Sequence, residues 1–373
     1  MKKKLLALVC ALVMIFSLAS CGLSTPDTVG KVGDFEVSSG LYLLAQFSAY
    51  QQAAQLADKD QDTTDVKAFL KETITTDADS GETAVVQDYV ADKTLETLRT
   101  FAAIDARFAE LGGELTAEQT QVADNYAQQL MDQYGSTYTA NGIGLETLKA
   151  FERIQLKHTL LLTLVYGPDG ESPVDDSDLT EHLDSQMYEL AYVNIPLYNT
   201  STFVSASDDQ KAQMLQLAQA AASCSETQDG SVSEQVSALH SAASAALPDI
   251  YAVLDSTPAE DASNVQTELL TESDLTGAFT QDGAADAVRG LVYGEAAAVQ
   301  YNAASIILMM RIDPLQVSTL DALRTQILSD MKGDELEDAL TAYGSTLENN
   351  LSTSAMNKMP ASKIVNPSSS SNS

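Results

Sequence analysis

The sequence predicts a mostly helical α+β protein, built from a helical lobe and an α+β domain inserted into it. Apolar residues recur at helical spacing through residues 85–166 and again from Val317 onward. Between these regions, the segments LAYVNIPL and VQYNAASIILMMRI carry strand patterns. Helical material on both sides of the insert favours a C-terminal helix that folds back onto the N-terminal helices.

The first residues have the pattern of an export signal. Residues 2–4 are lysines, residues 5–18 are uncharged, and small residues then lead to Cys21. The uncharged run is shorter than the roughly 20 residues that span a bilayer. Small residues before a cysteine resemble the lipobox of bacterial lipoproteins, which implies removal of residues 1–20 and a lipid anchor on Cys21. We expect a location on the extracytoplasmic face of a bacterial cell membrane; the alternative is an ordinary secretory signal with an incidental cysteine.

The chain is strongly acidic. Its 373 residues include 20 Lys and Arg against 53 Asp and Glu, a net charge of -33. Nothing basic is concentrated enough to displace the counterions of a phosphate backbone, so nucleic acid is excluded as the main partner. Cys10 leaves with the signal and Cys21 carries the lipid, so Cys224 has no partner for a disulfide. Its place at the end of an Ala-rich helix predicts a buried, unreactive thiol.

Residues 21–168 form the predicted N-terminal helical lobe. After a short tether, the segment VGKVGDFEVSSGLYLL predicts a hairpin-like piece and then a helix capped by Ser38 or Ser39. Residues 58–82 are polar and rich in acids, so we expect a loop or an irregular insertion there.

Three helices are predicted to complete this lobe. The first shows an apolar face and ends at a pair of glycines; that face is Leu98, Phe101, Ile104, Phe108 and Leu111. Thr116 and Gln119 have the spacing of a capping box, which predicts a second helix running to about Tyr134. The third runs from Leu145 to Val165 and ends at Gly167.

Residues 173–313 form the predicted α+β domain. In LAYVNIPL, Ala191 to Leu197 alternate between apolar and other positions, which is typical of a strand. An Ala-rich helix with Met214 and Ala218 on one stripe follows. VQYNAASIILMMRI is apolar on both faces at its core and predicts one central, covered strand. Residues 317–365 then predict a helix as far as Leu351, packed on the N-terminal lobe, and residues 366–373 a disordered tail.

No constellation of residues predicts catalysis, a metal site or a cofactor. Asp58, Asp60 and Asp62 start like a calcium loop, but Thr63 and Phe69 occupy the places of the required Gly and Glu. The three histidines, His158, His182 and His240, are far apart and lack ligand spacing. Nucleophile-elbow, phosphate-loop and CxxC motifs do not occur.

The order of segments resembles the PrsA/SurA-like extracytoplasmic foldases. The matching parts are the lipobox, the KVGDFEVSSGLYLL opening, the DYVADKTLETLRTFAAIDARFAELGGELTAEQ helix pair and FTQDGAADAVRGLVYGE. The last is similar to the parvulin stretch that ends in Leu-x-x-Gly-Glu, here Leu291, Gly294 and Glu295. The resemblance implies a helical chaperone lobe with a parvulin-like domain inserted into it.

The resemblance also implies where a proline pocket would lie. Leu275 and Phe279 are similar to the family's Met-x-x-x-Phe wall, whereas the two family histidine positions read Asn194 and Ser305. These four residues form the expected vestigial pocket, with no catalytic residue among them. We therefore expect a chaperone that binds unfolded or partly folded exported proteins without efficient catalysis. The alternatives are an active peptidyl-prolyl cis-trans isomerase of the parvulin type and a solute-binding lipoprotein.

Overall fold

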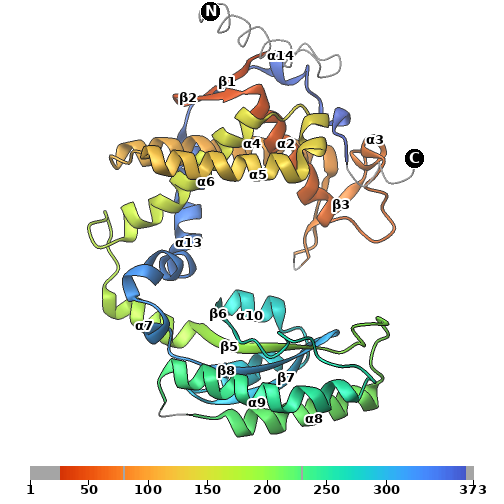
Figure 1. The fold of residues 1–373 in the computed structure, drawn as a ribbon. Coiled ribbons are helices and arrows are strands. Elements are labelled where there is room, and N and C mark those ends of the chain that lie inside the picture. Colours follow the sequence, from red (N-terminus) through yellow and green to blue (C-terminus); the bar gives the residue numbers. More distant parts are fainter. Residues whose placement is uncertain (1–25, 79, 228–229, 367–373) are drawn as a thin grey trace, which may run out of the picture. The chain divides into compact units, whose positions relative to one another are not determined.

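The computed structural model describes residues 26–78, 80–227 and 230–366 (Figure 1). Most of these residues are helical and the strands form small antiparallel sheets, so the predicted mostly helical α+β class is confirmed. The chain divides into two compact units: unit 1 is residues 1–171 with 332–373, and unit 2 is residues 172–331. The predicted signal peptide, the lipid site at Cys21 and residues 367–373 of the predicted tail lie outside the described residues.

Unit 1 is a set of helices with two small sheets. Its strands are β1 (Thr28–Val32), β2 (Phe35–Ser38), β3 (Thr73–Asp77), β4 (Glu82–Val85) and β9 (Asn349–Leu351). Its helices are α2 (Ser39–Gln55), α3 (Val66–Phe69), α4 (Val86–Glu110), α5 (Ala117–Ala140), α6 (Leu145–Tyr166), the C-terminal part of α13 (Leu320–Thr346), α14 (Thr353–Met356) and the 3-10 turn η1 (Ala361–Lys363).

The residues predicted to begin or end helices of unit 1 are found at helix ends. The Ser38 hydroxyl accepts a hydrogen bond from the Leu41 amide and begins α2. Thr116 and Gln119 form the capping box of α5, which continues to Ala140 rather than ending near Tyr134. The left-handed backbone of Gly112, at φ +72°, follows the end of α4.

The acid-rich stretch 58–82 is not the loop that its composition predicts. It contains α3 and most of the β3–β4 hairpin, and its larger apolar side chains are buried, namely Val66, Phe69, Leu70 and Ile74. Phe69 is fully buried, and its ring meets that of Tyr50 edge-on at a centroid distance of 5.8 Å. A small number of well-placed apolar residues is therefore enough to anchor a polar segment.

The C-terminal residues return to unit 1 as several short elements rather than as one helix. The predicted helix to Leu351 ends at Thr346, because residues 349–351 form β9, which pairs antiparallel with β1. Further along, the Val365 amide donates to Asn141 Oδ1 at 2.8 Å, and Asn141 Nδ2 donates to the Val365 carbonyl oxygen at 2.9 Å. Asn366, the first residue of the predicted tail, is buried and donates to the Thr63 carbonyl oxygen at 2.9 Å.

Unit 2 is a four-stranded antiparallel sheet with helices on both faces (Figure 1). Its strands, in the spatial order β6-β5-β8-β7, are β6 (Gln266–Thr271), β5 (Met187–Pro196), β8 (Ser305–Arg311) and β7 (Ala296–Asn302). Its helices are α7 (Asp176–Gln186), α8 (Asp208–Ser225), α9 (Val232–Ala252), α10 (Glu272–Ala278), α11 (Ala284–Arg289), α12 (Pro314–Val317) and the N-terminal part of α13.

Alternation along the strands divides the apolar residues of unit 2 between the two faces of its sheet. Ala191, Val193 and Ile195 of β5 pack with α8 and α9 in one buried cluster. Tyr188 and Leu190 of the same strand pack on the opposite face, with α10 and α11.

Two predictions in unit 2 are corrected. The segment VQYNAASIILMMRI is two strands, because the chain reverses after Asn302 and returns as β8. β8 lies between β5 and β7 and is buried on both faces, as the apolar pattern indicates. Cys224 is exposed rather than buried, since the buried stripe of α8 passes through Ala218 and Ala222.

Unit 2 extends to Met331, beyond the boundary expected at residue 313. The Arg324 guanidinium bonds the Asp176 carboxylate at 2.8 Å, and His182 Nε2 lies 2.6 Å from Asp330 Oδ2. These contacts tie the first turns of α13 to α7. Across the described residues, no helix is both long and apolar enough to span a membrane.

Candidate functional site

The expected proline pocket falls on one face of the unit 2 sheet. A capping box formed by Thr271 and Asp274 begins α10, and this helix places Leu275 and Phe279 over the sheet. Leu275 is fully buried and Phe279 is 6% exposed, within a cluster that includes Ile307 and Met309 of β8. The two side chains therefore form a packed wall.

Asn194 and Ser305 belong to this same face by the alternation of their strands. Asn194 lies opposite Ile307 in the register of β5 and β8, and its side chain is exposed. Ser305 lies two residues before Ile307 and is 9% exposed. A sheet position two residues away points to the same side, so all four expected residues share one face.

Tyr301 connects two of these residues, Phe279 and Asn194, and no sequence motif pointed to it. Its ring packs against Phe279 at a centroid distance of 5.3 Å, and its hydroxyl donates to Asn194 Oδ1 at 3.4 Å. Tyr301 lies within β7, at the irregularity in the β7–β8 register between Gln300 and Asn302, and no local sequence signal marks this position.

Tyr192 adds a second aromatic side chain to this face. Its hydroxyl lies 3.1 Å from both Gln266 Oε1 and Glu268 Oε2. Burial and the nearby Glu268 carboxylate raise the pKa of Tyr192, which keeps its hydroxyl protonated and donating. Tyrosine, asparagine and serine side chains offer contact area and hydrogen bonds here, and none of them exchanges a proton readily at neutral pH.

Unit 1 contains an open groove of about 630 Å³, which we call the α4 groove. It lies among the β1–β2 turn, α4 and the end of α13. Its apolar lining consists of small α4 residues and larger neighbours: Ala102, Ala106, Ala109, Val32, Phe35, Tyr343 and Leu347. The three alanines share one helix face because they are four and three residues apart, and they leave room above the helix.

The rim of the α4 groove is acidic. Asp34, Asp105, Glu110 and Glu348 line it, and no Lys or Arg of the described chain does. Glu110 is held by the Tyr343 hydroxyl at 2.5 Å and by Arg107 at 2.8 Å, and these hydrogen bonds lower the pKa of its carboxyl. Lys157 and Arg107 compensate Asp105 and Glu110, so the negative potential at the groove comes mainly from Asp34 and Glu348.

A second hollow of about 500 Å³ adjoins the α4 groove and shares Asp105 and Ala109 with it. Its cations already have partners. Lys157 pairs with Asp105, and Arg153 binds Asp124 through two hydrogen bonds of 2.9 and 2.8 Å. Positive charge in this hollow is therefore largely neutralised by the protein itself.

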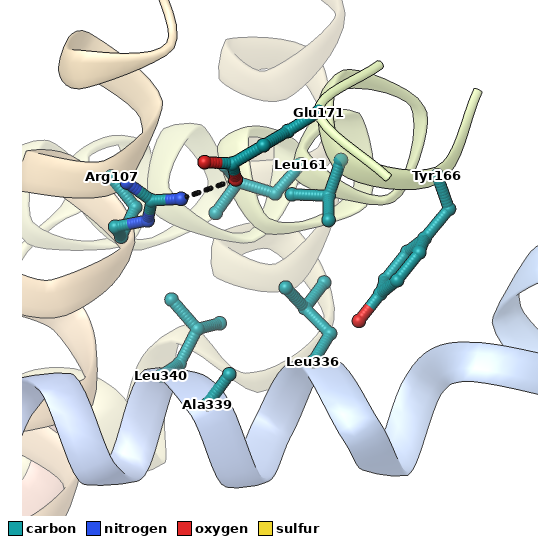
Figure 2. A pocket seen from close by; sticks show the side chains of 8 residues that line it. Arg107, Leu161, Tyr166, Glu171, Leu336, Ala339 and Leu340 are labelled. Carbon is teal, nitrogen blue, oxygen red and sulfur yellow. Dashed lines mark hydrogen bonds and ion pairs between the residues drawn. The ribbon is translucent and has the colours of Figure 1, made fainter. Parts of the chain in front are cut away.

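Figure 2 shows a smaller cavity of about 120 Å³ between α6 and α13. Leu161, Leu336 and Leu340 point into it, and the ion pair of Arg107 with Glu171, 2.8 Å long, lies at its side. Apolar walls and small volume indicate a packing defect between two helices rather than a site for chemistry.

The exposed face of α5 carries a further apolar stripe. Val122, Tyr126 and Tyr134 are 45%, 56% and 47% exposed. Their spacings of four and eight residues keep them near one side of the helix. Tyr134 also meets Tyr138 edge-on at a centroid distance of 6.4 Å.

The three histidines have separate partners. His158 Nε2 lies 3.1 Å from Glu337 Oε1, His182 contacts Asp330, and His240 Nδ1 lies 2.8 Å from the Ser263 carbonyl oxygen. The structure does not gather three potential metal ligands anywhere in its described part. Asp58, Asp60 and Asp62 all lie in the exposed segment before α3, where the Asp62 carboxylate accepts hydrogen bonds from Thr64.

Comparison with known proteins yields likenesses among solved structures. No family model and no curated protein sequence matches the chain. Among solved structures, it is similar to the crystal structure of foldase protein PrsA from Streptococcus pneumoniae, at 13% sequence identity and a TM-score of 0.34. The alignment covers 77% of this chain and 93% of that chain.

Proposed function

We propose that this protein is a membrane-anchored extracytoplasmic chaperone, which binds unfolded segments of exported proteins without efficient catalysis. The observation that carries the proposal is the α4 groove, an open apolar surface of about 630 Å³ rimmed by carboxylates. Unfolded segments expose the apolar side chains that folded proteins bury, and such a groove removes these side chains from water. A lipid on Cys21 would hold the groove near the membrane that exported chains cross.

The aromatic face of unit 2 supports the same function. The partly exposed rings of Tyr301 and Tyr192 lie on the same face as the Asn194 amide, and the buried Phe279 packs behind Tyr301. Rings of this kind bind apolar side chains through contact area, and the amide can hydrogen-bond a peptide backbone. Both units then offer surfaces suited to an extended chain.

The net charge of -33 suits a protein that carries apolar surfaces. Like charge on every copy opposes self-association, so the α4 groove and the α5 stripe can remain open in solution.

Suppression of aggregation tests the proposal. A denatured secreted protein is diluted into buffer with or without a several-fold molar excess of the full-length chain, and light scattering is followed. We expect less scattering with the chain present, and a weaker effect for Ala106→Phe, which fills the α4 groove. Ala91→Phe, on an exposed position of the same helix, is the matched control. Unchanged scattering with wild-type chain in excess contradicts the proposal.

Prolyl isomerisation is the second candidate function. It is favoured by the contact chain from Phe279 through Tyr301 to Asn194, which offers a ring wall beside an amide. A peptide isomerisation assay decides between binding and catalysis. A rate above the uncatalysed one that falls in Phe279→Ala would establish catalysis.

A solute-binding function agrees less well with unit 1. Such a protein needs two lobes of alternating strands and helices. In unit 1, α4, α5 and α6 follow one another without an intervening strand among the described residues.

A further inference from the structure

The lining of the α4 groove favours some unfolded segments over others. This inference rests on the proposed function, the binding of unfolded segments. Its floor is made of alanine side chains, so a partner backbone can approach the helix closely. Its volume of about 630 Å³ falls within the range of about 300–1,000 Å³ that is typical of ligand sites. An aliphatic side chain of a bound segment would contact Phe35 and Leu347 as well as these alanines.

The four carboxylates on the rim differ in whether they form an ion pair with the protein. Asp105 pairs with Lys157, and Glu110 pairs with Arg107. Asp34 and Glu348, in contrast, form no ion pair in the part of the chain that the structure describes, and both are exposed.

The backbone holds these two carboxylates near each other. The Gly33 amide donates to the Glu348 carbonyl oxygen at 2.8 Å, and this bond extends the pairing of β1 with β9. Asp34 directly follows Gly33 in the β1–β2 turn. The turn and the segment after α13 therefore place two unpartnered negative charges beside one apolar floor.

We propose that the α4 groove binds extended peptide segments in which an aliphatic residue stands next to Lys or Arg. The aliphatic side chain occupies the alanine floor, and the cation meets Asp34 and Glu348. Acidic segments are rejected because Asp34 and Glu348 already place two unpaired negative charges at the rim, and juxtaposed like charges oppose association.

Binding of three short labelled peptides to the full-length chain tests this inference, with fluorescence anisotropy as the readout. The first places Leu beside Lys in a Gly-Ser background, the second replaces Lys by Glu, and the third replaces Leu by Ser. We expect the Leu-Lys peptide to bind best, and its affinity to fall as salt is raised.

The double variant Asp34→Asn with Glu348→Gln should lower the affinity for the Leu-Lys peptide about tenfold, since two close charges are removed. The matched control is Asp92→Asn with Glu82→Gln, which makes the same charge change at exposed positions outside the groove. Ala106→Phe should also lower the affinity for this peptide, because the larger side chain occupies the space above the alanine floor. Ala91→Phe should leave binding unchanged.

Equal affinity of the Leu-Lys peptide for the rim variant and its control overturns the inference. So does equal affinity of the wild-type chain for the Leu-Lys and Leu-Glu peptides, or no binding of either. If the wild-type chain still suppresses aggregation in those cases, the chaperone proposal survives and only this selectivity fails. If the peptides bind as expected while aggregation is not suppressed, the inference stands and the chaperone proposal fails.

Discussion

At the residue scale, two glutamates illustrate that the surroundings of a carboxylate decide whether its charge stabilises or destabilises the fold. Glu189 is 6% exposed in the central sheet of unit 2, where burial and then Glu268 raise its pKa. Glu337 lies on α13, and its close contact with His158 lowers the pKa of the Glu337 carboxyl. The charge of Glu189 therefore opposes folding at neutral pH, and the charge of Glu337 favours it.

Replacing Glu189 by Gln should stabilise the protein at neutral pH. A carboxyl whose folded pKa is raised costs stability once the pH is above that pKa, and the cost disappears as the pH falls below the ordinary value near 4.5. We expect a gain of about 0.5–1 kcal/mol at pH 7, a size common for relieved charge penalties. Urea unfolding of wild type and variant at pH 7 and pH 4 measures it. A variant that is less stable at pH 7 would contradict the assignment.

Replacing Glu337 by Gln should have the opposite pH dependence. A carboxyl with a lowered folded pKa contributes stability above its unfolded pKa of about 4.5, and this contribution is lost as the pH falls through the folded value. The variant should be less stable than wild type at pH 6, and the difference should vanish in stronger acid. Thermal unfolding across this range tests the sign, and a difference that grows in acid would exclude it.

At the element scale, the β1–β9 pairing is what fixes the end of α13. Gly30 makes this pairing possible. Its φ is +124°, and a Cβ at this position would lie 2.4 Å from the backbone oxygen of Asn350. Only a glycine avoids both the strained backbone and this contact. The helix therefore stops at Thr346 because the next residues are required in a sheet.

We expect Gly30→Ala to destabilise unit 1 by about 3 kcal/mol or more, since backbone strain and a backbone clash are combined. Gly81→Ala is the matched control: its φ is also positive, at +70°, but no atom lies within 4 Å of the added Cβ. This control should cost only about 1–2 kcal/mol. Chemical denaturation of both variants provides the comparison. Equal losses would mean that the contact with β9 contributes nothing.

At the scale of the whole molecule, the chain leaves unit 1 after residue 171 and returns to it at residue 332. The two buried clusters of unit 2 draw all their members from within residues 172–331. Unit 1, in contrast, depends on distant segments, because β9, Leu336 and Leu340 come from the C-terminal part of the chain.

Residues 172–331 should consequently fold on their own, with one cooperative thermal transition and dispersed amide resonances. Residues 1–171 alone should be much less stable, since they lack the strand and the leucines that complete their core. Circular dichroism and NMR of the two fragments test this asymmetry. Failure of residues 172–331 to unfold cooperatively would refute it.

Much of the fold could be predicted from local patterns. Features that depend only on neighbouring residues can be predicted from short stretches of sequence. They include the caps at Ser38 and Thr116, the apolar face of α4 and the alternation of β5. Local patterns do not indicate the structure of residues 58–82, because composition does not show that Phe69 and Ile74 are buried. They do not indicate the turn after Asn302 either, since this turn contains no glycine.

The candidate sites depend more heavily on tertiary structure. The resemblance of the sequence to parvulin-type domains implied that Asn194, Leu275, Phe279 and Ser305 share one region, whereas the position of Tyr301 beside Phe279 became evident only from the place of β7 in the sheet. The α4 groove could not be predicted, because its lining comes from residues 32–35, 102–110 and 343–348.

By itself, the sequence determined the fold class, the starts of α2 and α5 and the acidic character of this protein, since these follow from spacing, capping residues and composition. Tertiary structure alone decided that Asp34 and Glu348 stand beside an alanine floor, and that the C-terminal segment ends α13 by joining β1. The physical reason is range: caps and amphipathic faces are set within a few residues, whereas a groove or a strand pairing is set by packing between segments hundreds of residues apart.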